Sequence, residues 1–137
     1  MLKSFKIIDS KLVQSDDEKG EVLLFIAPDK NELKKLIDDY QVDEHTLSSS
    51  LDPDEISRLE FEDDHFVLIL KRPKNYSTSD NLLFKITSIG AFVFKDKMVI
   101  IMPEDIQILE GKHNLKINNF NDVLLKLLYG TISHFLG

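Results

Sequence analysis

The side chains best suited to chemistry in this sequence are carboxylates, and they gather between residues 38 and 64. That segment holds eleven acidic residues and one basic residue, Arg58, in a chain of 137 residues with a formal net charge of -7. Carboxylate oxygens are the protein ligands that Mg²⁺ and Ca²⁺ prefer. The candidate metal ligands form two groups, which are Asp52, Asp54 and Glu55, and then Asp63 and Asp64. Weakly bound Mg²⁺ is therefore the cofactor that the composition suggests.

Two other roles explain the same acidic residues. The order Asp52-Pro53-Asp54-Glu55 is typical of a helix start, with Asp as the N-cap and Pro in the first helical position. An acidic stretch is also typical of a solvated surface that keeps a protein soluble. The Ca²⁺-loop pattern of alternating Asp or Asn with a central Gly is absent. We therefore expect weak, screening-type Mg²⁺ binding and no specific metal site.

The sequence lacks the patterns that mark an enzyme. Ser48-Ser49-Ser50 is not embedded in a Gly-x-Ser-x-Gly elbow, and it is predicted to be the polar end of a helix. The four histidines lack the paired spacings of a zinc site, and His65 is predicted to mark a solvated turn before a strand. Cysteine, the P-loop and the Gly-x-Gly-x-x-Gly pattern are all absent. No enzymatic activity is predicted.

Composition excludes several other classes. Leu, Ile, Val and Phe supply 50 of the 137 residues, which is enough for the core of one domain and argues against disorder. No basic run is present to neutralise phosphates, so we expect no nucleic-acid partner. No apolar run approaches the roughly 20 residues that cross a bilayer, and a signal-peptide apolar region is missing. The chain is expected to be soluble.

The predicted elements begin with strands and two capped helices. Residues 5–13 suit one strand or two short ones, and residues 21–27 form a continuous apolar run typical of a buried strand. Asp29 and Glu32 then stand in the positions of a capping box. The apolar residues that follow have helical spacing: Leu33, Leu36, Ile37 and Tyr40. Asp43 opens a second helix over residues 44–50.

The second half of the sequence predicts four or more strands and a final helix. Residues 59–62 alternate as in a half-exposed strand, and residues 65–71 predict a buried strand. A polar loop is expected at 74–81, strands at 82–89, 91–94 and 98–102, and a small helical turn and loop at 104–111. Asn119 or Asn121 is expected to cap a helix that runs to Gly137. The strands at 22–26 and 66–70 are expected in the middle of the sheet, with Leu68 buried.

These elements predict a fold of the α/β (α+β-like) class. A mixed β-sheet packs against helices as an α/β/α sandwich, in a single domain over residues 1–137.

The order of these motifs resembles a known family. The segment FIAPDKNELKKLIDDYQVDEHTLSSSLDPDEISRLEFEDDHFVLIL is similar to the cytoplasmic N-terminal domain of CorA-type magnesium transporters. The resemblance rests on Pro28 to Leu33, Leu47 to Asp52, Arg58, Leu59-Glu60 and Phe66 to Leu70 in that order. It extends over roughly residues 21 to 137, and Leu127-Leu128-Tyr129 resembles the start of the family's long stalk helix.

The resemblance implies a function and a setting. The chain would be the regulatory and assembly domain of a CorA-like Mg²⁺/Co²⁺ transporter, with neighbouring subunits of a pentamer and divalent cations as partners. It would lie at the cytoplasmic face of the inner membrane. It would be connected to the membrane only through C-terminal helices that this chain lacks. The helix at about 120–137 would be the start of a truncated stalk.

Two positions depart from the family pattern. Its acidic pair in the short helix, part of a regulatory cation site, aligns with Ser48 and Ser49, and its Arg-Pro aligns with Ile56-Ser57. The alternative to the transporter hypothesis is a free-standing acidic interaction or ligand-binding domain with no role in transport.

Overall fold

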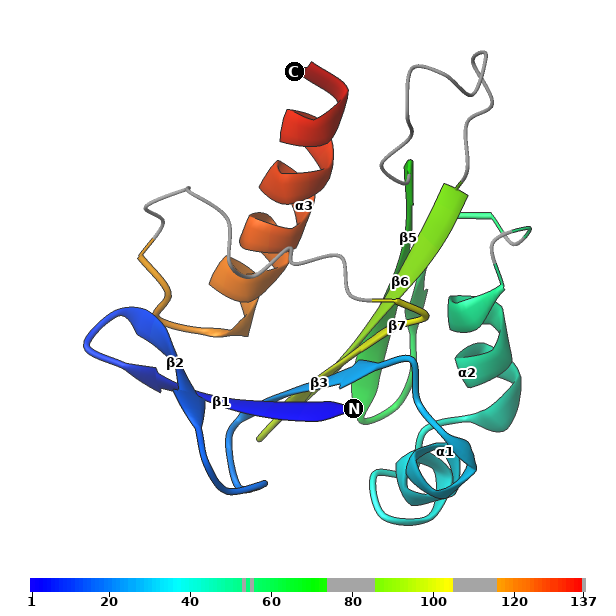
Figure 1. The fold of residues 1–137 in the computed structure, drawn as a ribbon, viewed down its shortest axis with the longest axis horizontal. Coiled ribbons are helices and arrows are strands. Elements are labelled where there is room, and N and C mark those ends of the chain that lie inside the picture. The colour runs from blue at the N-terminus through cyan, green and yellow to red at the C-terminus, as the bar shows by residue number, and fades with distance from the viewer. Residues whose placement is uncertain (53, 55, 74–85, 105–115, 137) are drawn as a thin grey trace.

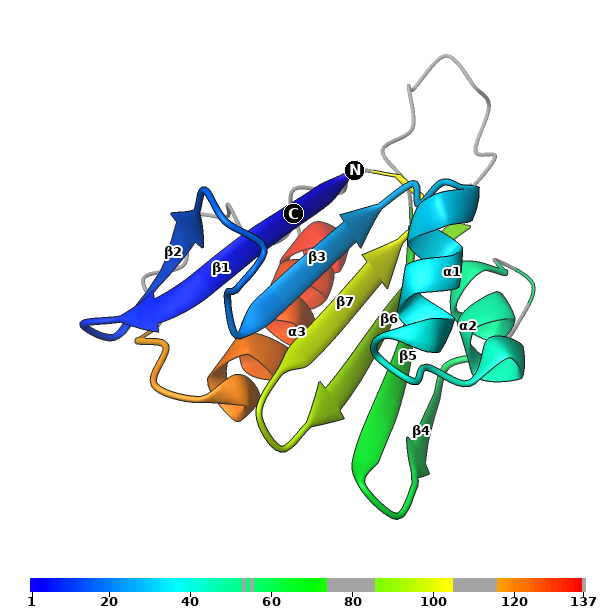
Figure 2. The same cartoon turned by 90° about the horizontal axis from the view of Figure 1, so that it is seen from below.

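A computed structural model describes residues 1–52, 54, 56–73, 86–104 and 116–136. Within these residues, one mixed sheet lies between two helices on one face and a third helix on the other (Figures 1 and 2). The strands are β1 (Leu2–Ile8), β2 (Lys11–Ser15), β3 (Val22–Ile26), β4 (Arg58–Phe61), β5 (His65–Pro73), β6 (Ile86–Phe94) and β7 (Met98–Met102). The helices are α1 (Lys30–Asp38), α2 (Glu44–Leu51) and α3 (Phe120–Leu136). The predicted α/β class, with helices on both faces of a mixed sheet, is confirmed.

The strand order is β2-β1-β3-β7-β6-β5-β4, and only the β3–β7 pair among these neighbours is parallel. The first two strands form a hairpin, so residues 5–13 contain two strands rather than one. Its turn residues Asp9 and Ser10 have φ angles of 51° and 61°. Two consecutive positive φ angles belong to the turn type whose twist matches that of paired strands.

β3 is the most deeply buried segment of the N-terminal half. All five of its residues are buried, as the apolar run predicts. Leu23 and Phe25 belong to the core under α1 and α2, whereas Leu24 and Ile26 belong to the core under α3. A strand covered on both faces has no side that tolerates polar residues, which explains its continuous apolar sequence.

The capping signals place the two short helices as predicted. The Asp29 carboxylate accepts a hydrogen bond from the Glu32 backbone N–H at 2.8 Å, and Glu32 accepts one from the Asp29 N–H at 3.2 Å. This reciprocal pair is a capping box. Leu36 is fully buried against the sheet, and Tyr40 packs there from just beyond the end of α1. The Asp43 side chain caps α2 by accepting a hydrogen bond from the Thr46 N–H.

Three sheet predictions are wrong: the position of β5, the burial of Leu68 and the division of β6 into two strands. β5 is the second strand from one edge and not in the middle, because β4 alone covers its outer side. Its side chains alternate: Val67 and Ile69 are buried under the α1–α2 layer, whereas Leu68 faces the α3 side and is only half-buried. β6 is one strand that continues through Gly90, where separate strands at 82–89 and 91–94 were expected.

α3 covers the opposite face through Val123 and Leu127, both fully buried. Asn119 is its cap, since its side-chain oxygen accepts a hydrogen bond from the Asp122 N–H at 3.0 Å. The expected loop at 74–81, residues 82–85 and residues 105–111 lie outside the described part of the chain.

The alternation in β5 generates a stability prediction. Replacing Ile69 with Ala should lower the free energy of unfolding by about 2–5 kcal/mol, because it leaves a cavity in a filled core. Leu68→Ala, the adjacent matched control, should cost clearly less, since the Leu68 side chain already contacts water. Chemical denaturation of both variants measures this difference, and equal losses would contradict the alternation.

Candidate functional site

The first acidic group lies at the end of α2. Asp52 is the residue that ends this helix, and its side-chain oxygen accepts a hydrogen bond from the Asp54 N–H at 2.9 Å. This is the local turn that Asp commonly forms with a backbone N–H two residues on. Asp54 itself is exposed, and Pro53 and Glu55 lie outside the described residues. Asp52 therefore terminates a helix, and the predicted helix start at this position is wrong, because residues 54, 56 and 57 are not helical.

The second acidic group lies in the turn between β4 and β5, where Asp63 and Asp64 are exposed. Asp64 is bonded to the His65 ring, with 2.6 Å between its Oδ1 and the ring Nδ1. This hydrogen bond lowers the pKa of the Asp64 carboxyl below its ordinary value of 3.8. His65 is the first residue of β5, and its ring stacks on Phe94 with a centroid distance of 4.5 Å. Asp64 thus orients a ring that packs on the sheet.

The two acidic groups do not converge. β4 runs between them, and a four-residue strand alone separates its ends by roughly 10 Å. In the described part of the chain, no three His, Asp or Glu side chains are grouped closely enough to hold a metal ion. Asp52, Asp54, Asp63 and Asp64 are thus separate surface carboxylates rather than one coordination sphere.

The acidic residues of the 38–64 segment nevertheless belong to neighbouring elements. They lie at the end of α1, in α2, along β4 and in the β4–β5 turn, which occupy one side of the molecule (Figure 2). Arg58 contacts Glu60 within β4, with 2.6 Å between Nε and Oε1. The eleven acidic residues of this segment predict a continuous negative face here, called the acidic flank below, and a calculation of the surface potential would test this.

The serine run of α2 has a structural role that the sequence did not reveal. Ser48 is exposed, but Ser49 is only 3% exposed and Ser50 is fully buried. The Ser88 hydroxyl donates a hydrogen bond to the Ser50 carbonyl at 2.5 Å. A Cβ placed on Gly90 would lie 2.5 Å from the Ser50 Cβ, so β6 needs glycine at that position.

This close packing limits what the serine positions could bind. Of the two positions that align with the family's acidic pair, only Ser48 faces solvent. Small residues in both α2 and β6 were the sequence signal for this close contact. The sequence does not show which of these small residues contact each other.

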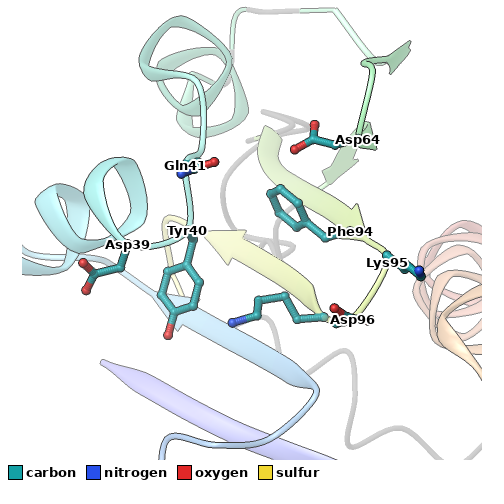
Figure 3. Close-up of a pocket in the computed structure, with 8 residues that line it drawn as sticks. Asp39, Tyr40, Gln41, Asp64, Phe94, Lys95 and Asp96 are labelled. Carbon is teal, nitrogen blue, oxygen red and sulfur yellow. The ribbon is translucent and has the colours of Figure 1, made fainter.

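A shallow depression of about 270 Å³ lies beside the second acidic group (Figure 3). Its lining residues come from the end of α1, the β4–β5 turn and the β6–β7 turn: Asp39, Tyr40, Gln41, Asp64, Phe94, Lys95, Asp96 and Lys97. The Lys97 ammonium lies over the Tyr40 ring, 4.6 Å from its centroid. Burial raises the pKa of Tyr40 above its ordinary value. The lining combines three carboxylates with two ammonium groups, so the depression favours neither anionic nor cationic ligands.

The sheet and its helices define a mixed α/β/α domain, and that is the fold of CorA-type cytoplasmic domains. The soluble domain of CorA from Methanocaldococcus jannaschii superposes with a TM-score of 0.70 over 98% of this chain, at 20% identity. The ZntB cytoplasmic domain from Vibrio parahaemolyticus RIMD 2210633 gives a TM-score of 0.67 over 98% of this chain, at 16% identity. The resemblance seen in the sequence is therefore confirmed at the level of the fold.

The match covers only part of each neighbour. This chain spans 58% of that CorA soluble domain and 59% of the ZntB domain. It spans 43% of the complete CorA magnesium transporter from M. jannaschii, with a TM-score of 0.65 and 18% identity. No protein-family model matches the chain, and no curated protein matches its sequence. Within the described ranges, no helix combines the length and the hydropathy that a membrane crossing requires.

The contact between α2 and β6 gives a second stability prediction. Gly90→Ala should lower the free energy of unfolding by about 1–3 kcal/mol, because the new methyl group overlaps the Ser50 side chain. Adding Ser50→Gly removes the Cβ that the new methyl group would overlap. The double variant should therefore lose less free energy of unfolding than the sum of the losses of the two single variants. Strictly additive losses in a denaturation cycle would show that the two positions do not meet.

The Asp43 cap makes a pH-dependent contribution. Its carboxylate accepts hydrogen bonds from the Thr46 N–H and hydroxyl, each at 2.9 Å, and the backbone bond is the main reason that its pKa falls below 3.8. A group with a lowered folded-state pKa stabilises the fold above its unfolded pKa, and this contribution disappears as the pH falls through the folded value.

We expect Asp43→Ala to cost about 1 kcal/mol at pH 7. Asp43→Asn keeps a hydrogen-bond acceptor but does not titrate. The difference in the free energy of unfolding between this variant and the parent chain should therefore shrink as the pH falls below about 3.8. Urea unfolding at pH 7 and pH 3 measures both effects. A difference that is the same at the two pH values would contradict this account of the cap.

Proposed function

We propose that this chain is the cytoplasmic regulatory and assembly domain of a CorA-like divalent-cation transporter that carries Mg²⁺ or Co²⁺. The observation that supports it most is the agreement of nearly the whole chain with the soluble domain of CorA, with a TM-score of 0.70. The order of sequence motifs between Pro28 and Leu70 supports the same proposal independently of the superposition. The proposed role is structural and regulatory rather than enzymatic.

The proposal includes a setting for the domain. Membrane spans would be supplied by residues beyond Gly137, with α3 leading into the stalk that reaches them, and the domain would lie at the cytoplasmic face of the inner membrane. Copies of the domain would pack side by side in a homo-oligomer, a pentamer as in the family. A cation that binds better in one global state of such an assembly shifts the equilibrium toward that state.

The acidic flank has a role in this proposal without being a metal centre. A surface of one charge sign raises the local concentration of ions of the opposite sign. Asp52, Asp54, Asp63 and Asp64 are exposed and separated, which suits diffuse cation accumulation. Specific Mg²⁺ binding needs one or two carboxylates that converge on an octahedral site.

Reading the sequence that follows residue 137 and measuring ion flux test the proposed function. Two apolar spans of about 20 residues should follow. The full-length protein, reconstituted in lipid vesicles with a fluorescent indicator inside, should then admit Mg²⁺ or Co²⁺. A stop codon directly after Gly137, or vesicles that remain closed to both ions, would contradict the proposal.

A metal titration of the 137-residue chain gives a further prediction. A specific site would stabilise the fold by about 2.7 kcal/mol when the ligand is at a hundred times its Kd. We expect only a small, non-saturating rise in Tm across a Mg²⁺ series at constant ionic strength, because the candidate ligands do not converge. Asp63→Asn and Asp52→Asn should each leave this rise nearly unchanged. A large saturating shift at sub-millimolar Mg²⁺, abolished by either change, would reveal a specific site.

A further inference from the structure

The tip of the β1–β2 hairpin carries apolar and charged side chains that are open to solvent. Ile8 is 48% exposed and lies directly opposite Lys11, which is also exposed. Between them stands the turn of Asp9 and Ser10, and the Ser10 carbonyl accepts a hydrogen bond from the Ile117 N–H at 2.9 Å. Figure 2 shows this tip at the left, projecting away from α1 and α2. An exposed tip that is already held in place loses little conformational entropy when it contacts a partner.

The mixed character continues along one face of the hairpin. Val13, which is 41% exposed, lies opposite Lys6, and this pair shares a sheet face with Ile8 and Lys11. Leu2, on the same face of β1, packs against the core under α1 and α2. Figure 2 shows neither of these helices over β1 or β2. The hairpin therefore presents two lysines and two aliphatic side chains on a part of the sheet that α1 and α2 leave open.

The charge of the hairpin is opposite to that of the acidic flank. Residues 1–15 contain three lysines and one aspartate, a local charge of +2. Residues 38–64 contain eleven acidic residues and one arginine, a local charge of -10. At physiological ionic strength exposed charges act over about 8 Å, so local charge governs a contact more than net charge does. The net charge of -7 thus permits a contact between the hairpin of one copy and the acidic flank of another.

The depression beside Asp64 has features that complement this tip (Figure 3). Tyr40 and Phe94 contribute half-buried aromatic side chains to its lining, and charged groups of both signs surround them. Pockets for drug-sized ligands usually measure about 300–1,000 Å³, so a shallow depression of about 270 Å³ is small for such a ligand. This lining suits a few side chains of a protein partner that are apolar in part and carry both signs of charge. The tip meets that description with an isoleucine, an aspartate and a lysine.

The tip and the depression lie at the same end of the sheet, on different sides of the molecule. β1 is antiparallel to β3, and β3 is parallel to β7, so the hairpin turn lies at the end where β7 begins. The β4–β5 and β6–β7 turns, which line the depression, lie at that end as well. Four strand spacings of about 4.8 Å, or roughly 19 Å, separate β1 from β5, so the tip cannot reach Asp64 of its own chain. Only the tip of another copy can contact that carboxylate.

We propose that the hairpin tip of one copy packs into the depression of a neighbouring copy. In this contact Ile8 packs on the Phe94 ring, and Lys11 faces the Asp64 carboxylate. The inference rests on the proposed function, which supplies the homo-oligomer, and it names the contact between the copies. Such a contact joins two different surface patches, and head-to-tail contacts of this kind form closed rings when the rotation between copies closes. Because both patches lie at the same end of the sheet, a rotation about an axis along the strands brings them together without a shift along that axis.

Disulfide formation tests this contact, because the 137-residue chain has no cysteine of its own. The test variant carries Ile8→Cys and Asp64→Cys. The matched control carries Gln14→Cys and Asp64→Cys, because Gln14 is also exposed on the hairpin but lies opposite Phe5, on the face toward α3. Both are made in the full-length protein in lipid vesicles, after any additional cysteine is replaced by serine. Diamide is the oxidant, non-reducing gel electrophoresis measures the rate and size of the linked species, and circular dichroism checks folding.

We expect the test variant to form disulfides at least about tenfold faster than the control, because a held contact raises the effective concentration of the two thiols. The Cα atoms of two cysteines must lie within about 7 Å to form a disulfide, so a link between these positions joins two copies. A head-to-tail contact gives a ladder of linked species larger than a dimer. Adding Lys11→Glu to the test variant should slow the linking severalfold, whereas Lys11→Arg should leave the rate unchanged.

Equal linking rates in the test variant and the control would overturn the inference, and so would linking that stops at a dimer. Ion flux into the same vesicles, measured before oxidation, separates this result from the proposed function. Vesicles that admit Mg²⁺ or Co²⁺ while the test variant links no faster than the control overturn the inference alone. A ladder in vesicles that remain closed to both ions overturns the proposed transport function and supports the contact.

Discussion

The parallel pairing of β3 with β7 is the constraint on which the rest of this fold depends. The two strands run side by side from Val22 opposite Met98 to Ile26 opposite Met102, and every residue in both is buried. A parallel pair cannot be joined by a tight turn, so the chain must cross from one end of the sheet to the other between them. Here the crossover first forms α1 and α2 on one face and then β4, β5 and β6 on the way back. The strands β4, β5 and β6 are thus contained within the connection.

Local chemistry explains why the N-terminal half of the fold could be predicted from sequence. The capping box of Asp29 and Glu32, the Asp43 cap and the apolar run of β3 each involve residues within a few positions of one another. Interactions of this range are present in the sequence itself, and the structure places those elements where they were expected. The Leu33 to Tyr40 spacing likewise predicts which side of α1 meets the sheet.

The errors concern interactions between distant segments. Alternation along β4 indicates a half-exposed strand but does not tell which side faces the core, and here the apolar side faces water. The burial of Ser50 depends on Gly90, forty residues later in the chain. The candidate metal ligands follow from residue type alone. Residue type is enough to predict a charged surface, but it is not enough to predict a metal site. Whether Asp52 and Asp63 converge depends on the position of β4 between them, and that is a property of the tertiary structure.

The separation of β3 and β7 in the chain has a consequence for synthesis. Ribosomes add about 5–20 residues per second, so several seconds pass between the appearance of Val22 and that of Met98. During this interval β3 can pair with β1 and be covered on one face by α1 and α2, but its other edge lacks β7 and its other face lacks α3. Strand pairs that are far apart in the sequence also form slowly, because closing the intervening loop costs entropy before any stabilising contact offsets that cost. The nascent chain therefore depends on protection of one five-residue segment, Val22–Ile26, until the centre of the sheet can close.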